Sequence, residues 1–181
     1  AREYDIVIYG ATGFTGSLAA SYVAQTYGTL KIPGTRTHVE KRVVRWAVAG
    51  RSLSKLNAVS KKCGGVPIIV ADASDDSALE DLARRTKVVV ACAGPFSRYG
   101  GRLVAACVKS VTDYCDITGE VDWVREMICV HDDEARKTGA RIVHLCGHDS
   151  VPWDISTLKL SDCLMEANDG EKLARVDFFT D

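Results

Sequence analysis

A glycine-rich stretch near the start of the chain is the first candidate for chemistry. Residues 10–16 read GATGFTG and follow the apolar residues 6–8. Glycines there allow a tight turn, a close approach of the backbone to a pyrophosphate, and close packing of a helix against a strand. The spacing is GxxGxxG and not GxGxxG, so the glycines alone also suit a purely structural turn. Their place between a predicted strand and a predicted helix favours a dinucleotide-binding turn.

The end of the second predicted strand indicates which dinucleotide would bind. An acidic residue there would accept hydrogen bonds from a ribose, whereas an arginine would meet a 2′-phosphate. The strand ends in Ala-Gly followed by Arg51 and Ser52, with no Asp or Glu. Arg51 can donate two hydrogen bonds, and Ser52 starts a helix, where an anion is also favoured. We therefore expect the cofactor to be NADP(H), with NAD(H) as the weaker alternative. The structural alternative is that Arg51 is a solvated surface residue.

Two more strand ends point to the same crevice, because ligands bind at the carboxyl ends of parallel strands. Asp72 closes the third predicted strand and could reach the adenine edge or cap a local turn. The fourth strand ends in the small residues Ala93 and Gly94, followed by Pro95. Their size would let the backbone run beside a nicotinamide.

Hydride transfer also needs a group that donates a proton to the alkoxide, enolate or amine that forms. Tyr99, Asp116 and Asp149 stand near the predicted strand ends and are the catalytic candidates. Further polar residues at these ends are Glu120, His148 and Ser150. Each candidate has a structural alternative: the aspartates could cap turns and Tyr99 could pack its helix. Cys92, Cys115 and Cys146 could also lie near the crevice, but core packing is the favoured interpretation.

These residues would be positioned by alternating strands and helices. Strands are predicted at residues 5–10, 43–49, 67–71, 88–91, 111–117 and 141–145. Parallel neighbours need crossover connections, so the alternation predicts a doubly wound α/β fold: a mainly parallel, six-stranded Rossmann sheet with helices on both faces. In the first helix, Leu18, Tyr22 and the neighbouring alanines are expected to face the core, and Ser77 with Glu80 predicts a capping box.

The pattern changes in two places. Residues 28–41 predict a loop longer than usual. After Asp154, residues 155–166 predict a helix and residues 176–179 a strand with no helix after it. We therefore expect a dinucleotide-binding domain at residues 1–158 and the start of a truncated second domain at residues 159–181.

Composition excludes several classes of partner. The chain has 181 residues, 23 Lys and Arg against 24 Asp and Glu, and no long block of one charge, which argues against nucleic-acid binding. No apolar run approaches the roughly 20 residues of a transmembrane helix, and no apolar leader is visible. Seven cysteines without a CxxC pair favour a reducing intracellular compartment, the cytoplasm. No metal site is expected, apart from a zinc site formed by long-range convergence.

Five ordered motifs resemble one family. GATGFTG, AGRSLSKL, CAGPFSRYGGRLVAACV, DYCDITGE and CGHDSVPWD follow one another over residues 5–158 as they do in saccharopine dehydrogenase-like oxidoreductases, which also resemble trans-acting enoyl reductases. The resemblance implies a cofactor domain that continues into a second α/β domain. It assigns three groups of residues: Gly10, Thr12, Gly13, Phe14 and Gly16 to the pyrophosphate, Arg51 to the adenosine phosphate, and Ala93, Gly94 and Pro95 to the nicotinamide side. It also points to Tyr99 and Gly100. His148, where the family pattern has Phe, and Trp153 depart from it.

The resemblance implies hydride transfer from NADP(H) to a carbonyl, imine or enoyl small-molecule substrate, which could be lipid-like. It further implies a homodimer formed through the second domain, and peripheral association with membranes or lipid droplets. A short-chain dehydrogenase is not indicated, because the one YxxxK match, at Tyr27 and Lys31, lies in a predicted loop. The alternative function is a non-catalytic NAD(P)-binding domain for sensing or protein interaction.

Overall fold

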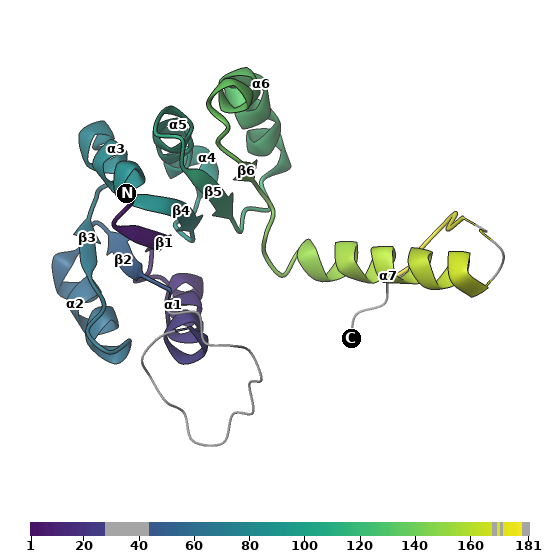
Figure 1. Cartoon of the computed structure of the whole chain (residues 1–181), viewed down its shortest axis with the longest axis horizontal. Coiled ribbons are helices and arrows are strands. Elements are labelled where there is room, and N and C mark those ends of the chain that lie inside the picture. The colour runs from purple at the N-terminus through teal and green to yellow at the C-terminus, as the bar shows by residue number, and fades with distance from the viewer. Residues whose placement is uncertain (28–43, 168–169, 171, 179–181) are drawn as a thin grey trace.

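The fold is a single parallel sheet with helices on both sides (Figure 1). The computed structural model describes residues 1–27, 44–167, 170 and 172–178, so the predicted loop at 28–41 lies outside the described residues. Six parallel strands are hydrogen-bonded in the order β3-β2-β1-β4-β5-β6. Their bounds are β1 Tyr4–Tyr9, β2 Trp46–Gly50, β3 Ile68–Val70, β4 Thr86–Ala91, β5 Asp113–Asp116 and β6 Ile142–Val143. The predicted doubly wound α/β fold is confirmed.

Seven helices connect or follow these strands in the described part of the chain. Their bounds are α1 Phe14–Thr26, α2 Leu53–Lys62, α3 Asp76–Arg85, α4 Phe96–Tyr99, α5 Gly101–Lys109, α6 Val121–Thr138 and α7 Val151–Ala167. Helices α1 and α2 cover one face of the sheet, and α3, α5 and α6 cover the other (Figure 1). The chain therefore changes face between β1 and β4, which is where such sheets bind ligands.

The core explains why the strands read as continuous apolar runs. Val7 and Ile8 in β1, Val48 in β2 and Val89 in β4 are fully buried, because helices pack on both faces of these central strands. Leu79 and Leu82 of α3 and Leu103 of α5 fill the larger of two clusters, as their helical spacing predicts. A rigid sheet therefore supports the loops at its carboxyl edge.

Helix α1 packs through a different face from the one predicted. Leu18 and Tyr22 are 55% and 59% exposed, whereas Gly16, Ala20 and Ala24 are buried. The prediction was wrong for the two large residues because the helix lies so close to the sheet that only small side chains fit between them. Large side chains consequently point outward, although their four-residue spacing looks like a core face.

The predicted capping box of α3 is also replaced. Asp75 is the N-cap residue, and its carboxylate accepts a hydrogen bond from the Ala78 amide at 3.0 Å. Glu80 instead accepts hydrogen bonds from the Lys109 ammonium at 2.6 Å and the Arg84 guanidinium at 3.3 Å. Because Asp75 accepts the hydrogen bond of a free amide at the start of α3, Glu80 is available for the contact with Lys109 that joins α3 to α5.

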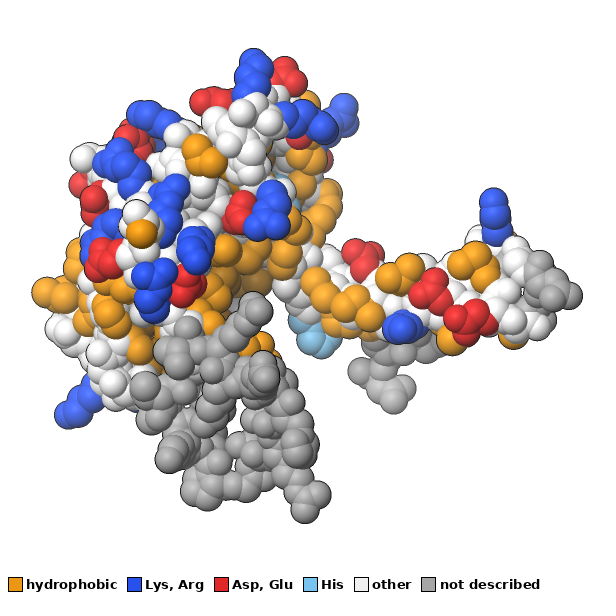
Figure 2. All heavy atoms as spheres, viewed as in Figure 1, with side chains coloured by type: hydrophobic (Ala, Val, Ile, Leu, Met, Phe, Trp, Pro, Cys, Tyr) orange, Lys and Arg blue, Asp and Glu red, His pale blue; other side chains and the backbone are white. Residues whose placement is uncertain are grey.

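Helix α7 extends away from the body of the molecule (Figure 1). None of its side chains is buried, and Figure 2 shows hydrophobic side chains along its surface. Ile155, Leu158 and Leu160 are among its exposed apolar residues. The helix continues across position 158, and described residues 176–178 form no strand. None of the described helices has the length and hydropathy to cross a membrane.

Candidate functional site

A cavity of about 510 Å³ opens at the carboxyl ends of β1, β2, β3 and β4. Its volume falls within the range of small-molecule and cofactor sites. Eight residues predicted from the sequence as site residues line it: Gly10, Thr12, Gly13, Arg51, Asp72, Ala93, Gly94 and Tyr99. The cavity therefore lies where the strand order reverses, and it collects residues from four separate segments of the chain.

The glycine turn forms the floor of this cavity. Gly10 donates its amide proton to Ala49 O at 2.9 Å, and Gly13 donates to Gly10 O at 3.0 Å. Gly10 has φ +80°, and a Cβ added to it would lie 2.8 Å from the Cβ and N of Ala93. Only glycine fits both the backbone conformation and the space, so the turn can lie directly beside the segment that follows β4.

The start of α1 faces this turn without a polar side chain to cap it. Its N-cap residue is Gly13, and neither a side-chain cap nor an acidic residue is present in the first turn. The amides of such a helix start are suited to an anion. A Cβ on Gly16 would lie 2.2 Å from Gly10 O, so glycine is needed for the helix to approach the turn. Phe14 is 84% exposed and does not line the cavity.

Arg51 and Asp72 lie on the wall formed by β2 and β3. Arg51 is exposed directly after β2, at the position where the sequence predicts a residue that binds the 2′-phosphate. Ser52 is the N-cap residue of α2 but makes no side-chain cap, and it does not line the cavity. Asp72 accepts hydrogen bonds from the amide and the hydroxyl of Ser74 at 2.9 and 2.7 Å, which lowers the pKa of its carboxyl group. These bonds hold Asp72 in a local turn, which is the structural one of the two interpretations given for this residue from the sequence.

The opposite wall is the turn between β4 and α4. Ala93 and Gly94 line the cavity, and the peptide bond from Gly94 to Pro95 is cis. Pro95 is the N-cap residue of α4 and does not itself line the cavity. The carboxylate of Glu120 accepts hydrogen bonds from the amides of Phe96 at 2.7 Å and Ser97 at 3.0 Å. Hydrogen bonding by Ser97, through its side chain and then its amide, and by the Phe96 amide lowers the pKa of Glu120.

The three predicted catalytic residues occupy different environments. Tyr99 lines the cavity and is 39% exposed, and the Arg98 guanidinium lies 5.7 Å from the centre of its ring. Asp149 is exposed and does not line the cavity, while Asp116 is only 1% exposed. The geometry thus brings Tyr99 to the cavity and leaves both aspartates outside it.

Asp116 is held in a network of hydrogen bonds at the ends of β5 and β6. Its Oδ1 accepts from the amides of Thr118 at 3.1 Å and Leu145 at 3.2 Å. Its Oδ2 accepts from the Tyr114 hydroxyl at 3.0 Å and lies 2.6 Å from Nδ1 of His144. A buried carboxylate with these partners ties two strand ends together.

Seven cavity residues were not predicted as site residues, and Tyr9 and Cys92 are the two among them whose pKa is shifted. Burial, and then the charge of Asp72, raise the pKa of Tyr9 to about 12. Its hydroxyl therefore stays protonated at neutral pH and donates a 3.4 Å hydrogen bond to Ala71 O. Burial raises the pKa of Cys92 to about 11, so its thiol is unreactive at neutral pH. The signal that could have found Tyr9 is its position as the last strand residue before the glycine turn.

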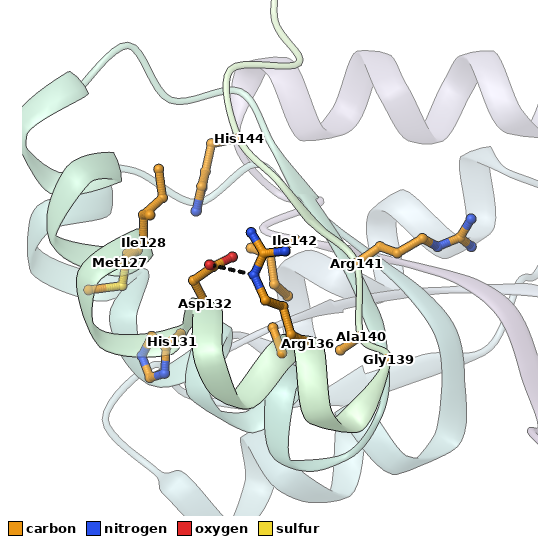
Figure 3. A pocket seen from close by; sticks show the side chains of 11 residues that line it. Met127, Ile128, His131, Asp132, Arg136, Gly139, Ala140, Arg141, Ile142 and His144 are labelled. Carbon is orange, nitrogen blue, oxygen red and sulfur yellow. Dashed lines mark hydrogen bonds and ion pairs between the residues drawn. The ribbon is translucent and has the colours of Figure 1, made fainter.

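A second cavity, of about 390 Å³, lies between α6 and β6 (Figure 3). Asp132 and Arg136 form an ion pair at 2.7 Å on its wall, and His144 lies at one end. The cavity shares no lining residue with the first. Among the described residues, no group of three or more His, Cys, Asp or Glu side chains could hold a metal ion.

The family model that matches residues 6–143 is the saccharopine dehydrogenase NADP binding domain. The chain belongs to this family. It is an NADP-binding domain, and its matched residues include both walls and the floor of the cavity. The predicted family and cofactor are thus confirmed.

Curated relatives extend beyond this domain. The trans-acting enoyl reductase of Mycobacterium leprae is 44% identical over 174 residues, which are 94% of this chain and 38% of the relative. The trans-acting enoyl reductase of Mycobacterium ulcerans is 42% identical over the same shares of the two chains. The chain therefore spans 38% of the length of these relatives.

Solved structures share the fold. Saccharopine dehydrogenase (L-Glu forming) from Saccharomyces cerevisiae matches with a TM-score of 0.65 at 20% identity, over 92% of this chain and 32% of that chain. The Citrobacter sp. triphenylmethane reductase, in complex with NADP(H), matches with a TM-score of 0.54 at 14% identity, over 77% of this chain and 48% of that chain. At these identities the likeness concerns the fold.

Proposed function

We propose that this chain is the cofactor-binding part of an NADPH-dependent oxidoreductase that transfers a hydride to a carbonyl, imine or enoyl group. The observation that carries the proposal is the single cavity that joins the uncapped start of α1, Arg51 and the Ala93–Gly94 backbone. In this proposal Arg51 takes the 2′-phosphate, the start of α1 the pyrophosphate and the Ala93–Gly94 backbone the nicotinamide ring, which is the order of these groups along NADP.

Each part of the cavity has a role in this proposal. The turn at residues 10–16 and the first amides of α1 bind the pyrophosphate, and Arg51 binds the adenosine 2′-phosphate by paired hydrogen bonds. Ala93, Gly94 and Pro95 border the nicotinamide, which supplies the hydride when the cofactor is bound. The fit of the pyrophosphate to this turn depends on Gly10 and Gly16. A Cβ at Gly10 would collide with Ala93, and a Cβ at Gly16 would collide with the carbonyl oxygen of Gly10.

Tyr99 is the proposed proton donor, because it is the predicted catalytic residue on the cavity wall. Asp116 and Asp149 act indirectly at most, Asp116 by ordering the ends of β5 and β6. An enoyl thioester is the favoured substrate class, since the curated relatives are named enoyl reductases. From the family resemblance we further propose a lipid-like substrate, a homodimer formed through the second domain and association with lipid surfaces.

Calorimetry with NADPH and NADH tests the cofactor role. We expect NADPH to bind with one site per chain and more tightly than NADH. Absence of NADPH binding by the folded chain would remove the basis of the proposal. In the full-length protein, oxidation of NADPH upon addition of an enoyl thioester tests the reaction, and Tyr99→Phe should slow turnover while leaving NADPH affinity unchanged. NADPH binding without turnover of carbonyl, imine or enoyl substrates would favour the alternative, a cofactor-sensing module.

A further inference from the structure

Glu120 bridges the start of α6 and the turn that follows β4. Its two carboxylate oxygens each accept one backbone hydrogen bond, from Phe96 at 2.7 Å and from Ser97 at 3.0 Å. Both amides belong to the first turn of α4, directly after Ala93, Gly94 and Pro95. Glu120 itself does not line the cofactor cavity. Its carboxylate therefore contacts the backbone after the cavity wall and not the cavity itself.

Glu120 is itself held in place from the other side. Its amide donates a hydrogen bond to the Thr118 hydroxyl at 3.0 Å, and the Thr118 amide donates to Asp116 Oδ1 at 3.1 Å. Asp116 is buried and also accepts a hydrogen bond from the Leu145 amide. A continuous series of hydrogen bonds thus joins the ends of β5 and β6 to the turn after β4. Such a network fixes the position of the carboxylate before any ligand binds.

Aromatic packing fixes the same turn independently of these bonds. The rings of Phe96 and Trp123 lie 5.7 Å apart, and Trp123 is buried against α4 from its position on α6. A Cβ on Gly100 would lie 2.6 Å from the Trp123 ring, so α4 and α6 are in close contact. This contact does not involve Glu120. The Glu120 carboxylate meets the same turn separately, through the amides of Phe96 and Ser97.

We propose that Glu120 is a positioning residue, which holds the Ala93–Gly94–Pro95 turn in the shape that the nicotinamide half of NADPH requires. This inference rests on the proposed cofactor site. Glu120 contacts the turn after β4, whereas Arg51 and Asp72 lie on the opposite wall, formed by β2 and β3. Loss of Glu120 should therefore weaken binding of the nicotinamide half and spare the adenosine half.

The experiment compares NADPH with adenosine 2′,5′-bisphosphate, which lacks the nicotinamide half. Glu120→Gln keeps the side-chain size but leaves one acceptor oxygen for two amides, and Glu120→Ala removes both acceptors. We expect NADPH to bind about tenfold more weakly to Glu120→Ala, the loss expected for charge-assisted hydrogen bonds, with the affinity for the bisphosphate unchanged. The fluorescence of bound NADPH, which reports on the nicotinamide environment, should shift toward that of free cofactor.

Glu126→Gln is the matched control, because Glu126 lies exposed on α6, the helix whose N-cap residue is Glu120, and its replacement removes the same charge. It should leave both affinities unchanged. Equal weakening of both ligands by the Glu120 variants, or no weakening of either, would overturn the inference. If the unsubstituted chain binds neither ligand, the proposed function fails instead, so the two failures are distinguishable.

A measurement on the unsubstituted chain keeps the inference testable if the variants do not fold. The amide proton signals of Phe96 and Ser97 should shift together as Glu120 is protonated in acid, below the usual titration range of Glu, and their exchange with solvent should be slow. Addition of NADPH should move the signals of Ala93 and Gly94 more than addition of the bisphosphate does. Fast exchange at Phe96 and Ser97, or equal effects of the two ligands, would contradict a positioning role.

Discussion

Gly16→Ala adds one methyl group at the contact between α1 and the glycine turn. The added Cβ would lie 2.2 Å from Gly10 O and 2.9 Å from the Cα of Ala11. Carbon and oxygen atoms normally approach to about 3.3 Å, so the helix must move by about 1 Å. All the atoms in the way are backbone, and no side-chain rotation can relieve the contact. The shift also disturbs the buried contacts of Ala20 and Ala24 on the same helix face.

The expected loss of unfolding free energy is about 2 kcal/mol. Overpacking of a tight contact costs about 3 kcal/mol, and the better helix propensity of Ala recovers about 1 kcal/mol. For a chain of this length the loss corresponds to a decrease in Tm of about 4 to 8 °C. Because the first amides of α1 move as well, NADPH affinity should also decrease.

Thermal unfolding followed by circular dichroism measures this effect, with Gly101→Ala as the control. A Cβ at Gly101 would lie 3.7 Å from the Met127 side chain, which is an ordinary contact, and Gly101 is the first residue of α5. Gly101→Ala should therefore leave Tm unchanged or raise it. An unchanged Tm for Gly16→Ala, or an equal decrease for Gly101→Ala, would refute the argument from close packing.

Three further predictions concern other parts of the molecule. Asp116→Ala should reduce the unfolding free energy measured in urea by about 3 kcal/mol, because it leaves buried partners unsatisfied; a loss below about 1 kcal/mol would contradict the network. A thiol reagent at mildly alkaline pH should modify the exposed Cys129 and spare Cys115, whose pKa burial raises to about 12, and rapid labelling of Cys115 would contradict this. Arg45 and Lys87 hold the pKa of Asp5 well below its ordinary value, so its stabilising effect is complete above the unfolded-state pKa and is lost as the pH falls toward the folded-state pKa. The urea midpoint should therefore fall less steeply in acid for Asp5→Asn than for the unsubstituted chain, and identical slopes would contradict the pairing.

The strand positions and the cavity floor could be predicted because their signals are local. A strand buried on both faces leaves a continuous apolar run, and the residues after each strand end necessarily meet at one edge of a parallel sheet. Arg51, Asp72 and Gly94 therefore appeared as site residues without any knowledge of packing. The glycines of the turn were recognisable for the same reason, since their spacing fits the adjoining strand and helix, but the close contact of Gly10 with Ala93 depends on packing.

The remaining features depend on distances between elements. Leu18 and Tyr22 resemble a core face, but the approach of α1 to the sheet, set by Gly16, admits only small residues. The pairing of Asp116 with His144 depends on the register of β5 and β6, in which Tyr114 lies opposite Ile142. Residues this far apart in sequence give no sign of their contact.

The central claim, that this cavity binds NADP with Arg51 on the 2′-phosphate, is tested most directly by measuring four dissociation constants. These are the constants for NADPH and NADH with the unsubstituted chain and with Arg51→Ala. We predict a preference for NADPH that Arg51→Ala reduces by about tenfold, through weaker binding of NADPH and not through tighter binding of NADH. A preference for NADPH that Arg51→Ala leaves unchanged would contradict the assignment of Arg51, and equal affinities in the unsubstituted chain would contradict the claim as a whole.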